Sequence, residues 1–334
     1  MKFIGLNTRY TTADGGLKRR IHLDGAASPL AAQTAIDSIN DLLPHYSNSH
    51  SYVHNSAHIS TKALKWAHDA ILDFVGTPKE EFTAIFMGSG CTDAINRVAR
   101  GLSACSSERP IVLVSSMEHH ANDLPHRLKS NEVHHMPLTG TGDQLGSIDI
   151  AKVEQFFAAN PSSVNYIACS SVSNVTGIRN DWRTLTQIAH RYGAKVVLDA
   201  AQSVAHEPLN LHQLTPDQCP DFIVFSGHKL YTPMAPGVLV ARESELQSMQ
   251  GQNLGGGSVD HVSAFEYSLV PHFPDREQSG TPNIVGAFAL ASVASELQLD
   301  KIVAAESELM DYLLNRLGDL EFIKLYGDAE APRA

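Results

Sequence analysis

Cysteine is scarce in this chain, and the four that occur show neither a CxxC pair nor the spacing of zinc ligands. A structural zinc site and a disulfide framework are therefore not expected, and the thiols are predicted to be reduced. The four residues are Cys91, Cys105, Cys169 and Cys219.

Long apolar runs are missing as well. No stretch approaches the roughly 20 apolar residues that span a bilayer. Residues 1–20 interrupt their few apolar positions with charge and lack the apolar core of a signal peptide. These features predict a soluble, cytoplasmic protein with no membrane partner.

Positive charge is in the minority, since 25 Lys and Arg face 36 Asp and Glu and give a formal net charge of −11. This excess of acid disfavours nucleic acid and other polyanions as partners. Hydrophobic residues make up 43% and charged residues 18%, which excludes a disordered or fibrous chain. The length of 334 residues suits one large α/β domain and a second, smaller domain of the same chain.

Short β-rich apolar runs alternate with stretches that carry apolar residues at helical spacing. The runs predict strands at Ala84–Met87, Ile111–Ser115, Tyr166–Ser170, Val196–Asp199, Phe222–Phe225 and Gly237–Ala241. The stretches between them predict helices at Thr92–Gly101, Ile148–Ala159 and Trp182–Tyr192. Repeated β-α units of this kind indicate an α/β fold with a mainly parallel sheet flanked by helices.

The C-terminal part has a different pattern. Gly, Pro and Ser gather at Asn253–Ser258 and Gln278–Asn283, as is typical of loops. Ile284–Leu317 then alternates Ala and Leu with charged residues and predicts one long helix. A change of domain is expected near Gly280.

A glycine-containing turn follows the first predicted strand, where residues 87–96 read MGSGCTDAIN. Glycines allow a tight turn, and the start of the next helix offers free N–H groups to an anion, most often a phosphate. The pattern is neither a P-loop nor a dinucleotide fingerprint. A glycine-rich helix start without a ligand stays an alternative.

Two later strands end in side chains suited to chemistry. Asp199 closes one strand at its carboxyl end, where open α/β sheets bind ligands, and it could pair with a cationic ring nitrogen or cap the next helix. Lys229 closes the segment DFIVFSGHK and could form a Schiff base with an aldehyde, or be solvated. An anion loop, an Asp and a Lys in this order match the phosphate, ring nitrogen and aldehyde of pyridoxal 5′-phosphate (PLP), the predicted cofactor.

From about Ile21 to Tyr326 the sequence resembles the class V aminotransferase family of PLP enzymes, and within it the cysteine desulfurase and selenocysteine lyase branch. LDGAAS at residues 23–28 is similar to the family's substrate-side turn. EHHAN at 118–122 resembles the segment whose first His stacks on the pyridine ring, which points to His119. SNVTG at 173–177 resembles the segment whose Asn contacts the ring oxygen and the substrate, which points to Asn174.

The resemblance implies a catalytic set of Lys229, His119 and Asp199. Lys229 would form the Schiff base and, once released, act as base for the Cα proton, while Asp199 would keep the ring nitrogen protonated. Gln202 would bond the ring hydroxyl oxygen. The phosphate would be held by the side chains of Thr92, Ser226 and His228 and by the backbone of Gly90 and Cys91.

The resemblance also implies an assembly and a fold. Thr281 matches a residue that reaches the phosphate of the neighbouring subunit, which implies a homodimer with shared active sites. The implied fold is the PLP-dependent transferase fold type I. Its parts would be an N-terminal segment at 1–20, a large PLP-binding domain at 21–280, and the start of a small C-terminal domain at 281–334, incomplete here.

Departures from the family pattern concern the substrate. The sulfur-accepting Cys and the carboxylate-binding Arg of cysteine desulfurases lie beyond the matched region, and no cysteine here takes the acceptor position. Residues 231–237 read YTPMAPG where members commonly read YGPTG, and residues 48–54 read NSHSYVH, with Ser51 where Arg is common.

The function implied by the resemblance is elimination of sulfur or selenium from L-cysteine or a related amino acid, giving alanine, with a sulfur-acceptor protein as a further partner. An aminotransferase, epimerase or other lyase acting on a different amino acid is one alternative, and a non-catalytic truncated paralogue is another. The 17 histidines contain no HExxH or other ligand spacing, so no metal site is predicted.

Overall fold

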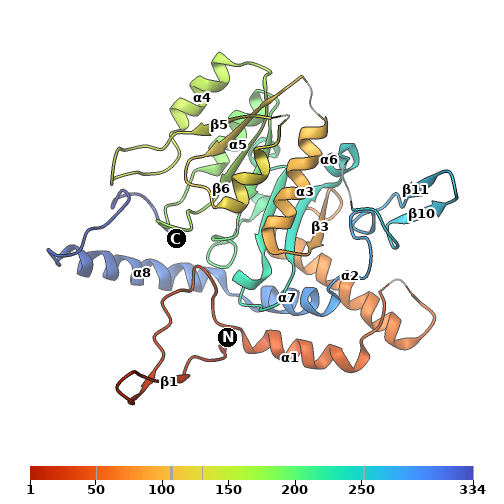
Figure 1. Ribbon diagram of the computed structural model, residues 1–334, viewed down its shortest axis with the longest axis horizontal. Coiled ribbons are helices and arrows are strands. Elements are labelled where there is room, and N and C mark those ends of the chain that lie inside the picture. The colour runs from red at the N-terminus through yellow and green to blue at the C-terminus, as the bar shows by residue number, and fades with distance from the viewer. Residues whose placement is uncertain (50, 106–107, 130, 251–252, 334) are drawn as a thin grey trace.

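The computed structural model describes residues 1–49, 51–105, 108–129, 131–250 and 253–333. At its centre is a seven-stranded sheet in the order β3-β9-β8-β7-β6-β4-β5 (Figure 1). The strands are β3 (Phe82–Met87), β4 (Ile111–Ser115), β5 (Glu132–Met136), β6 (Val164–Ser170), β7 (Lys195–Asp199), β8 (Phe222–Ser226) and β9 (Gly237–Arg242). Strand β9 runs antiparallel to both of its neighbours and the other pairs are parallel, so the predicted mainly parallel sheet is confirmed.

Helices cover both faces of this sheet, because alternate strand residues point to opposite sides. Leu113 and Leu198 face a core shared with α2 (Asn55–Val75), α4 (Ile150–Ala159), α5 (Trp182–Arg191) and α7 (Ile284–Glu296). Val112 and Val197 face a second core, shared with α3 (Gly90–Cys105) and α6 (Glu243–Ser248). Strands buried on both faces explain why the sequence shows continuous apolar runs rather than alternation.

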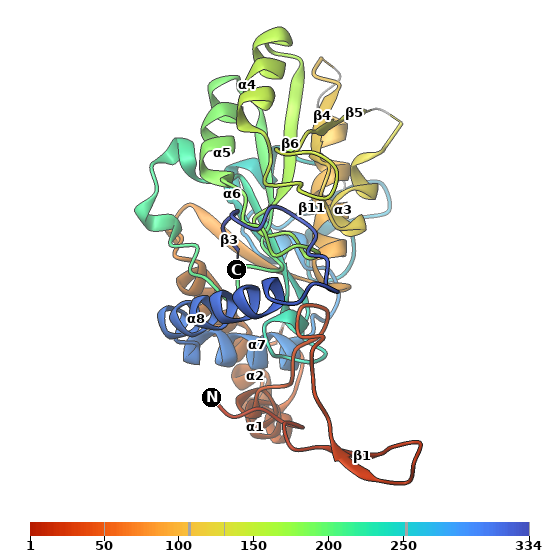
Figure 2. The ribbon, with the colours of Figure 1, turned by 90° about the vertical axis from the view of Figure 1, so that its left-hand side faces the viewer.

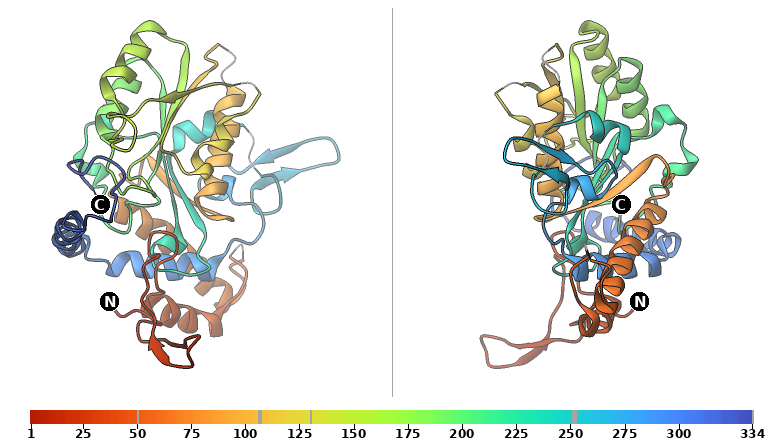
Figure 3. Two further views of the ribbon diagram at one scale, coloured as in Figure 1. Left: turned by 60° about the vertical axis from the view of Figure 1, so that its left-hand side comes forward. Right: turned by 90° about the vertical axis from the view of Figure 1, so that its right-hand side faces the viewer.

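Two hairpins stand out from this body (Figures 2 and 3). The first pairs β1 (Arg9–Thr11) with β2 (Leu17–Arg19), and every residue of both strands is exposed. Its register places Arg9 opposite Arg19. The second pairs β10 (Val259–Val262) with β11 (Tyr267–Leu269).

The prediction of one long helix over Ile284–Leu317 is wrong. The chain forms α7 and then α8 (Leu299–Gly318), with Leu297 in an extended conformation between them. Helix α7 is buried against α2 and α1 (Gln33–Leu42), whereas α8 has no buried residue. Tertiary packing ends α7 where no Gly or Pro marks the break, and Thr34 of α1 donates a hydrogen bond to Glu296 at that point.

None of the helices in the described part of the chain combines the length and the apolar character needed to cross a bilayer.

Candidate active site

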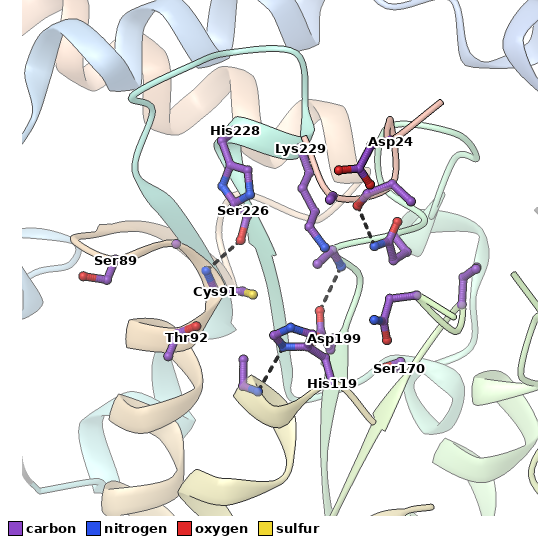
Figure 4. A pocket seen from close by; sticks show the side chains of 18 residues that line it. Asp24, Ser89, Cys91, Thr92, His119, Ser170, Asp199, Ser226, His228 and Lys229 are labelled. Carbon is purple, nitrogen blue, oxygen red and sulfur yellow. Dashed lines mark hydrogen bonds between the residues drawn. The ribbon is translucent and has the colours of Figure 1, made fainter. Parts of the chain in front are cut away.

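A cavity of about 520 Å³ opens at the carboxyl ends of β6, β7 and β8, beside the start of α3 (Figure 4). This is the edge at which open parallel sheets bind ligands. It gathers ten of the predicted site residues, namely Gly90, Cys91, Thr92, His119, Asn174, Asp199, Gln202, Ser226, His228 and Lys229. Residues that lie up to 139 positions apart in the sequence therefore share one chamber.

The turn between β3 and α3 forms one wall of the cavity. Gly90 has a φ of 64°, and a side chain there would place its Cβ 3.0 Å from Ser226 Oγ. The N–H of Cys91 donates to the same Oγ at 2.9 Å. A Cβ at Gly237 would lie 2.1 Å from the Gly90 carbonyl oxygen, so the turn packs directly on the start of β9. Only glycine allows this approach, which brings the N-terminus of α3 and its N–H groups to the cavity.

Asp199 occupies the end of β7 and is 5% exposed. Its Oδ1 accepts a hydrogen bond from the Ala201 N–H at 2.9 Å, the one donor to this carboxylate among the described residues. Burial raises the pKa of Asp199, while the Ala201 N–H and the charges of Lys229 and His119 oppose that rise. Asp199 is followed by a turn rather than by an α-helix, so the helix-cap alternative is not what the structure shows.

Lys229 and His228 follow β8 on a short 3-10 turn, Gly227–Lys229. A Cβ on Gly227 would lie 2.6 Å from both Ala235 Cβ and the Pro236 carbonyl oxygen, so this turn is held tightly by the loop that follows it. In Figure 4 the half-buried Lys229 side chain reaches into the cavity toward Asp199. Burial, and then the charge of Lys229, lower the pKa of His228.

His119 borders the cavity at the start of the 3-10 turn His120–Asn122. Its Nδ1 accepts a hydrogen bond from the Ala121 N–H at 3.0 Å, which leaves Nε2 to carry the hydrogen of the neutral ring. On the opposite rim, Gln202 Nε2 donates to the Ala26 carbonyl oxygen at 2.9 Å. The turn predicted on the substrate side thus borders the cavity through Asp24, Ala26 and Ala27.

Thr281 does not line this cavity. It lies in a neighbouring hollow of about 300 Å³ together with Gly88 and Asn283. Its predicted contact with the phosphate of a second subunit stays a prediction. His50, in the segment that departs from the family pattern at Ser51, lies outside the described residues, as does Ala334, the last residue of the predicted small domain.

The three buried cysteines, Cys91, Cys169 and Cys219, are protonated thiols. Cys91 lines the cavity, and burial, assisted by the charge of Asp199, raises its pKa to about 11. Burial raises the pKa of Cys219 to about 11 and holds that of Cys169 well above its ordinary value. Cys105 is exposed and lies outside the cavity lining.

Ser89 and Ser170 line the cavity although the sequence analysis did not select them. Ser170 closes the predicted strand Tyr166–Ser170, so the rule that singled out Asp199 and Lys229 at strand ends would have found it. Ser89 lies within the glycine-containing turn.

The cavity suits PLP in three respects. The N-terminus of α3 is exposed to it, as a phosphate requires. Asp199 presents a buried carboxylate at the cavity wall, as a pyridinium nitrogen requires. Lys229 projects an amine into the same space, and such an amine can form a Schiff base with an aldehyde.

Comparisons with known proteins confirm the family predicted from the motifs. The family model described as aminotransferase class V matches residues 21–334. A protein of Vibrio cholerae serotype O1 named "Probable cysteine desulfurase" is 32% identical over 298 residues, covering 86% of this chain and 70% of the relative. The apo structure of the cysteine desulfurase from Thermococcus onnurineus NA1 superposes with a TM-score of 0.75 at 27% identity, covering 90% of this chain and 72% of that one.

This chain therefore belongs to the class V aminotransferase family, in its cysteine desulfurase branch. These similarities support a PLP-dependent enzyme of the cysteine desulfurase type and its fold. The relatives are longer: a "Probable cysteine desulfurase" of Mycolicibacterium paratuberculosis is 31% identical over 318 residues, which cover 94% of this chain but 45% of the relative.

Proposed function

We propose that the chain binds PLP in this cavity and removes sulfur, or selenium, from L-cysteine or a related amino acid to give alanine. The observation that carries the proposal is the convergence of Lys229, Asp199 and the N-terminus of α3 on one cavity of about 520 Å³. The relatives named above, which are cysteine desulfurases by name, supply the choice of substrate.

Bound PLP would supply an aldehyde that condenses with amines and an electron-poor ring that stabilises negative charge at Cα. The backbone of Gly90 and Cys91, with Thr92, Ser226 and His228, would hold the phosphate. Asp199 would hold the proton on the ring nitrogen, because an anion beside a cationic group favours its charged form.

The remaining roles concern the ring and the substrate. His119 would lie against the ring face, and Gln202 and Asn174 would contact ring oxygen and substrate. The Lys229 amine would act as the general base for the Cα proton. These assignments follow the family resemblance and are consistent with all of these side chains lining the cavity.

The sulfur atom needs an acceptor thiol. In the balanced step, the Cβ–Sγ bond of cysteine breaks, Cβ gains a proton to give alanine, and the sulfur joins the acceptor thiolate as a persulfide. Cys91 is the cysteine that lines the cavity, and its raised pKa of about 11 keeps it a protonated, weak nucleophile. We infer that the acceptor is a free thiol or a separate protein.

A homodimer with shared active sites would bring Thr281 of one subunit to the phosphate site of the other. The position of Thr281 outside its own cavity is consistent with this arrangement. Sedimentation of wild type and Thr281→Ala, with PLP affinity measured for both, tests the assignment. The domain division at Gly280 and a cytoplasmic location also remain predictions, to be checked by limited proteolysis and cell fractionation.

The test of the reaction is release of alanine and sulfide from L-cysteine by PLP-loaded protein in the presence of a reducing thiol. Release that disappears in Lys229→Ala is expected. A wild-type protein that binds PLP but releases no alanine, even with added thiol, would contradict the proposal. A protein that takes up no PLP would favour the non-catalytic paralogue instead.

A different amino acid as substrate is the second candidate, favoured by the loop after Lys229. Tyr231 and Met234 have φ values of 53° and 63°, and this left-handed region is unusual for residues other than glycine. The loop therefore has its own shape beside the reactive amine. A screen of amino acids monitored by the absorbance of bound PLP discriminates this candidate, because a substrate other than cysteine should perturb the spectrum more strongly.

A further inference from the structure

The carboxylate of Glu118 joins three segments, two of which, β6 and the turn after His119, contribute residues to the cavity lining. Its Oε1 accepts hydrogen bonds from Ser115 Oγ at 2.5 Å and from the Ser170 N–H at 2.8 Å. Its Oε2 accepts one from Asn122 Nδ2 at 2.6 Å and one from Ser170 Oγ. Ser115 ends β4, Ser170 ends β6 and Asn122 ends the 3-10 turn after His119, so one side chain ties all three together.

The turn held by Glu118 also fixes the ring of His119. Asn122 belongs to the 3-10 turn His120–Asn122, and the Ala121 N–H of the same turn donates to His119 Nδ1 at 3.0 Å. The turn is also held by the Asn122 N–H, which donates to the His119 carbonyl oxygen at 2.8 Å, so loss of the Glu118 contact would loosen the position of the Ala121 donor rather than unfold the turn. We propose that Glu118 is the positioning residue that orients His119 toward the cofactor site.

The hydrogen-bond pattern suits an ionised Glu118. The Asn122 amide and the Ser170 N–H can only donate, and the hydroxyls of Ser115 and Ser170 can also donate to the carboxylate. Burial raises the pKa of Glu118 to about 7, and the hydrogen bonds from Ser115, Ser170 and Asn122 oppose that rise. Burial and hydrogen bonding therefore act in opposite directions on the charge of this carboxylate.

Among the described residues, no Lys or Arg donates a hydrogen bond to the Glu118 carboxylate. Asn122 donates to Glu118 and so turns its Oδ1 to His126 Nε2 at 3.1 Å, while His126 Nδ1 contacts the Tyr166 hydroxyl at 3.0 Å. Burial lowers the pKa of His126 to about 4, which keeps it neutral. Burial raises the pKa of the Cys169 thiol on β6 and keeps it neutral, and Asp199 is the register neighbour of Ser170 on the adjacent strand β7.

The inference rests on the proposed function for the identity of the cofactor. The variant Glu118→Gln tests the positioning role of Glu118 by a measurement that needs no bound cofactor. The matched control is Glu132→Gln, which removes an exposed carboxylate bonded to His134 on β5. In cofactor-free protein, ¹⁵N NMR should show His119 with hydrogen on Nε2 in wild type and in the control. Glu118→Gln should give a mixture of both tautomers.

With PLP added, the dissociation constant of Glu118→Gln should rise about tenfold at pH 8, as expected for lost hydrogen bonds to a charged group. The difference in PLP dissociation constant between Glu118→Gln and wild type should be smaller at pH 6, because Glu118 of the wild type then takes up a proton. Unchanged His119 tautomers and equal affinities at both pH values would overturn the proposal.

A second variant covers the case in which Glu118→Gln does not fold. Ser115→Ala removes one of the four donors without altering the cavity lining, so it should shift tautomer and affinity in the same direction by less. The absence of any shift would again overturn the proposal. If wild type fails to bind PLP, the proposed function fails, but the NMR comparison still decides the role of Glu118.

Discussion

Asp199 illustrates how position in the sheet determines the behaviour of a single carboxylate. Asp199 is the register neighbour of Ser170 on β6 and of Val224 on β8, so its strand β7 is an interior strand of the sheet rather than an edge strand. Burial there raises the pKa of Asp199, and the charges of the nearby Lys229 and His119 lower it in part. A cationic ring nitrogen beside this carboxylate would complete the compensation.

Asp199→Asn should preserve the shape of this position and remove its charge. We expect alanine release to fall by about 10² to 10³-fold, the usual cost of removing one electrostatic contact to the reacting group. Steady-state kinetics with PLP content measured by absorbance checks this. A variant that retains PLP and full activity would show that Asp199 does not act on the ring.

At the scale of elements, α3 matters because its N-terminus forms the wall of the cavity and its body is anchored by a buried ion pair. Arg97 donates through Nε and Nη2 to Glu277 at 2.8 Å each, and the two side chains are 1% and 2% exposed. Arg97 also donates to the Gln250 carbonyl oxygen. These contacts join α3 to the segment that leads to Thr281.

Glu277→Ala should destabilise the protein by about 3–5 kcal/mol, because it leaves the buried Arg97 guanidinium without its counter-ion. Urea unfolding measures the change. Asp73→Ala breaks the exposed Lys79–Asp73 pair and serves as control, with an expected cost below about 1 kcal/mol. Equal effects of the two variants would contradict the importance given to burial.

The glycine contact between elements gives a second prediction. Gly237→Ala would put Cβ within 2.1 Å of the Gly90 carbonyl oxygen, so β9 or the turn must move. We expect PLP affinity to fall more than tenfold, on the order of the cost of strain at a tight backbone contact. Gly142→Ala has nothing within 4 Å of its added Cβ but adopts a φ of 58°, so it tests backbone strain without the clash. Similar losses of PLP affinity in both variants would argue against a specific role for the contact.

Elements with a strong local signal were predicted well, and those set by tertiary contacts were not. Ile111–Ser115 forms β4 over the predicted residues, because a buried strand must be apolar throughout. Strand β5, Glu132–Met136, was not predicted, since an edge strand with exposed residues carries no apolar run. The break between α7 and α8 likewise has no Gly or Pro as a local marker, although it separates a buried helix from one with no buried residue.

The same distinction holds for the site. Asp199 and Lys229 could be placed because strand ends converge at one edge of a parallel sheet. Glu118 opens the EHHAN motif, but the sequence could not predict the hydrogen bonds that its carboxylate accepts. Its contact with Ser170 spans 52 positions and depends on how β4 and β6 are aligned.

At the scale of the whole molecule, buried ionisable groups determine the response to acid. Burial lowers the pKa of His68 and of His126 to about 4, below the 6.5 of an exposed histidine. Between pH 4 and pH 6.5 the unfolded chain therefore binds more protons than the folded one. The contribution of the two histidines to the free energy of unfolding is present above pH 6.5 and is lost as the pH falls toward 4. Glu118, with its raised pKa, acts in the opposite direction: its contribution is present at low pH and is lost as the pH rises through about 7.

The free energy of unfolding should fall by roughly 3–6 kcal/mol between pH 7 and pH 4, since each histidine accounts for about 3 kcal/mol and Glu118 offsets part. Urea unfolding at a series of pH values measures this slope. His68→Gln should flatten it, whereas the exposed His261→Gln should leave it unchanged. Identical slopes for His68→Gln and wild type would contradict the assignment.

The hairpin of β1 and β2 has a practical consequence for handling the protein. Arg9 lies opposite Arg19, and Lys18 opposite Tyr10, on strands that are exposed throughout. A protease that cuts after Lys and Arg should therefore cleave first in this hairpin, because exposed projecting turns are the preferred sites of nicking. The rate of that first cut reports whether another surface covers the hairpin, while the central sheet stays intact.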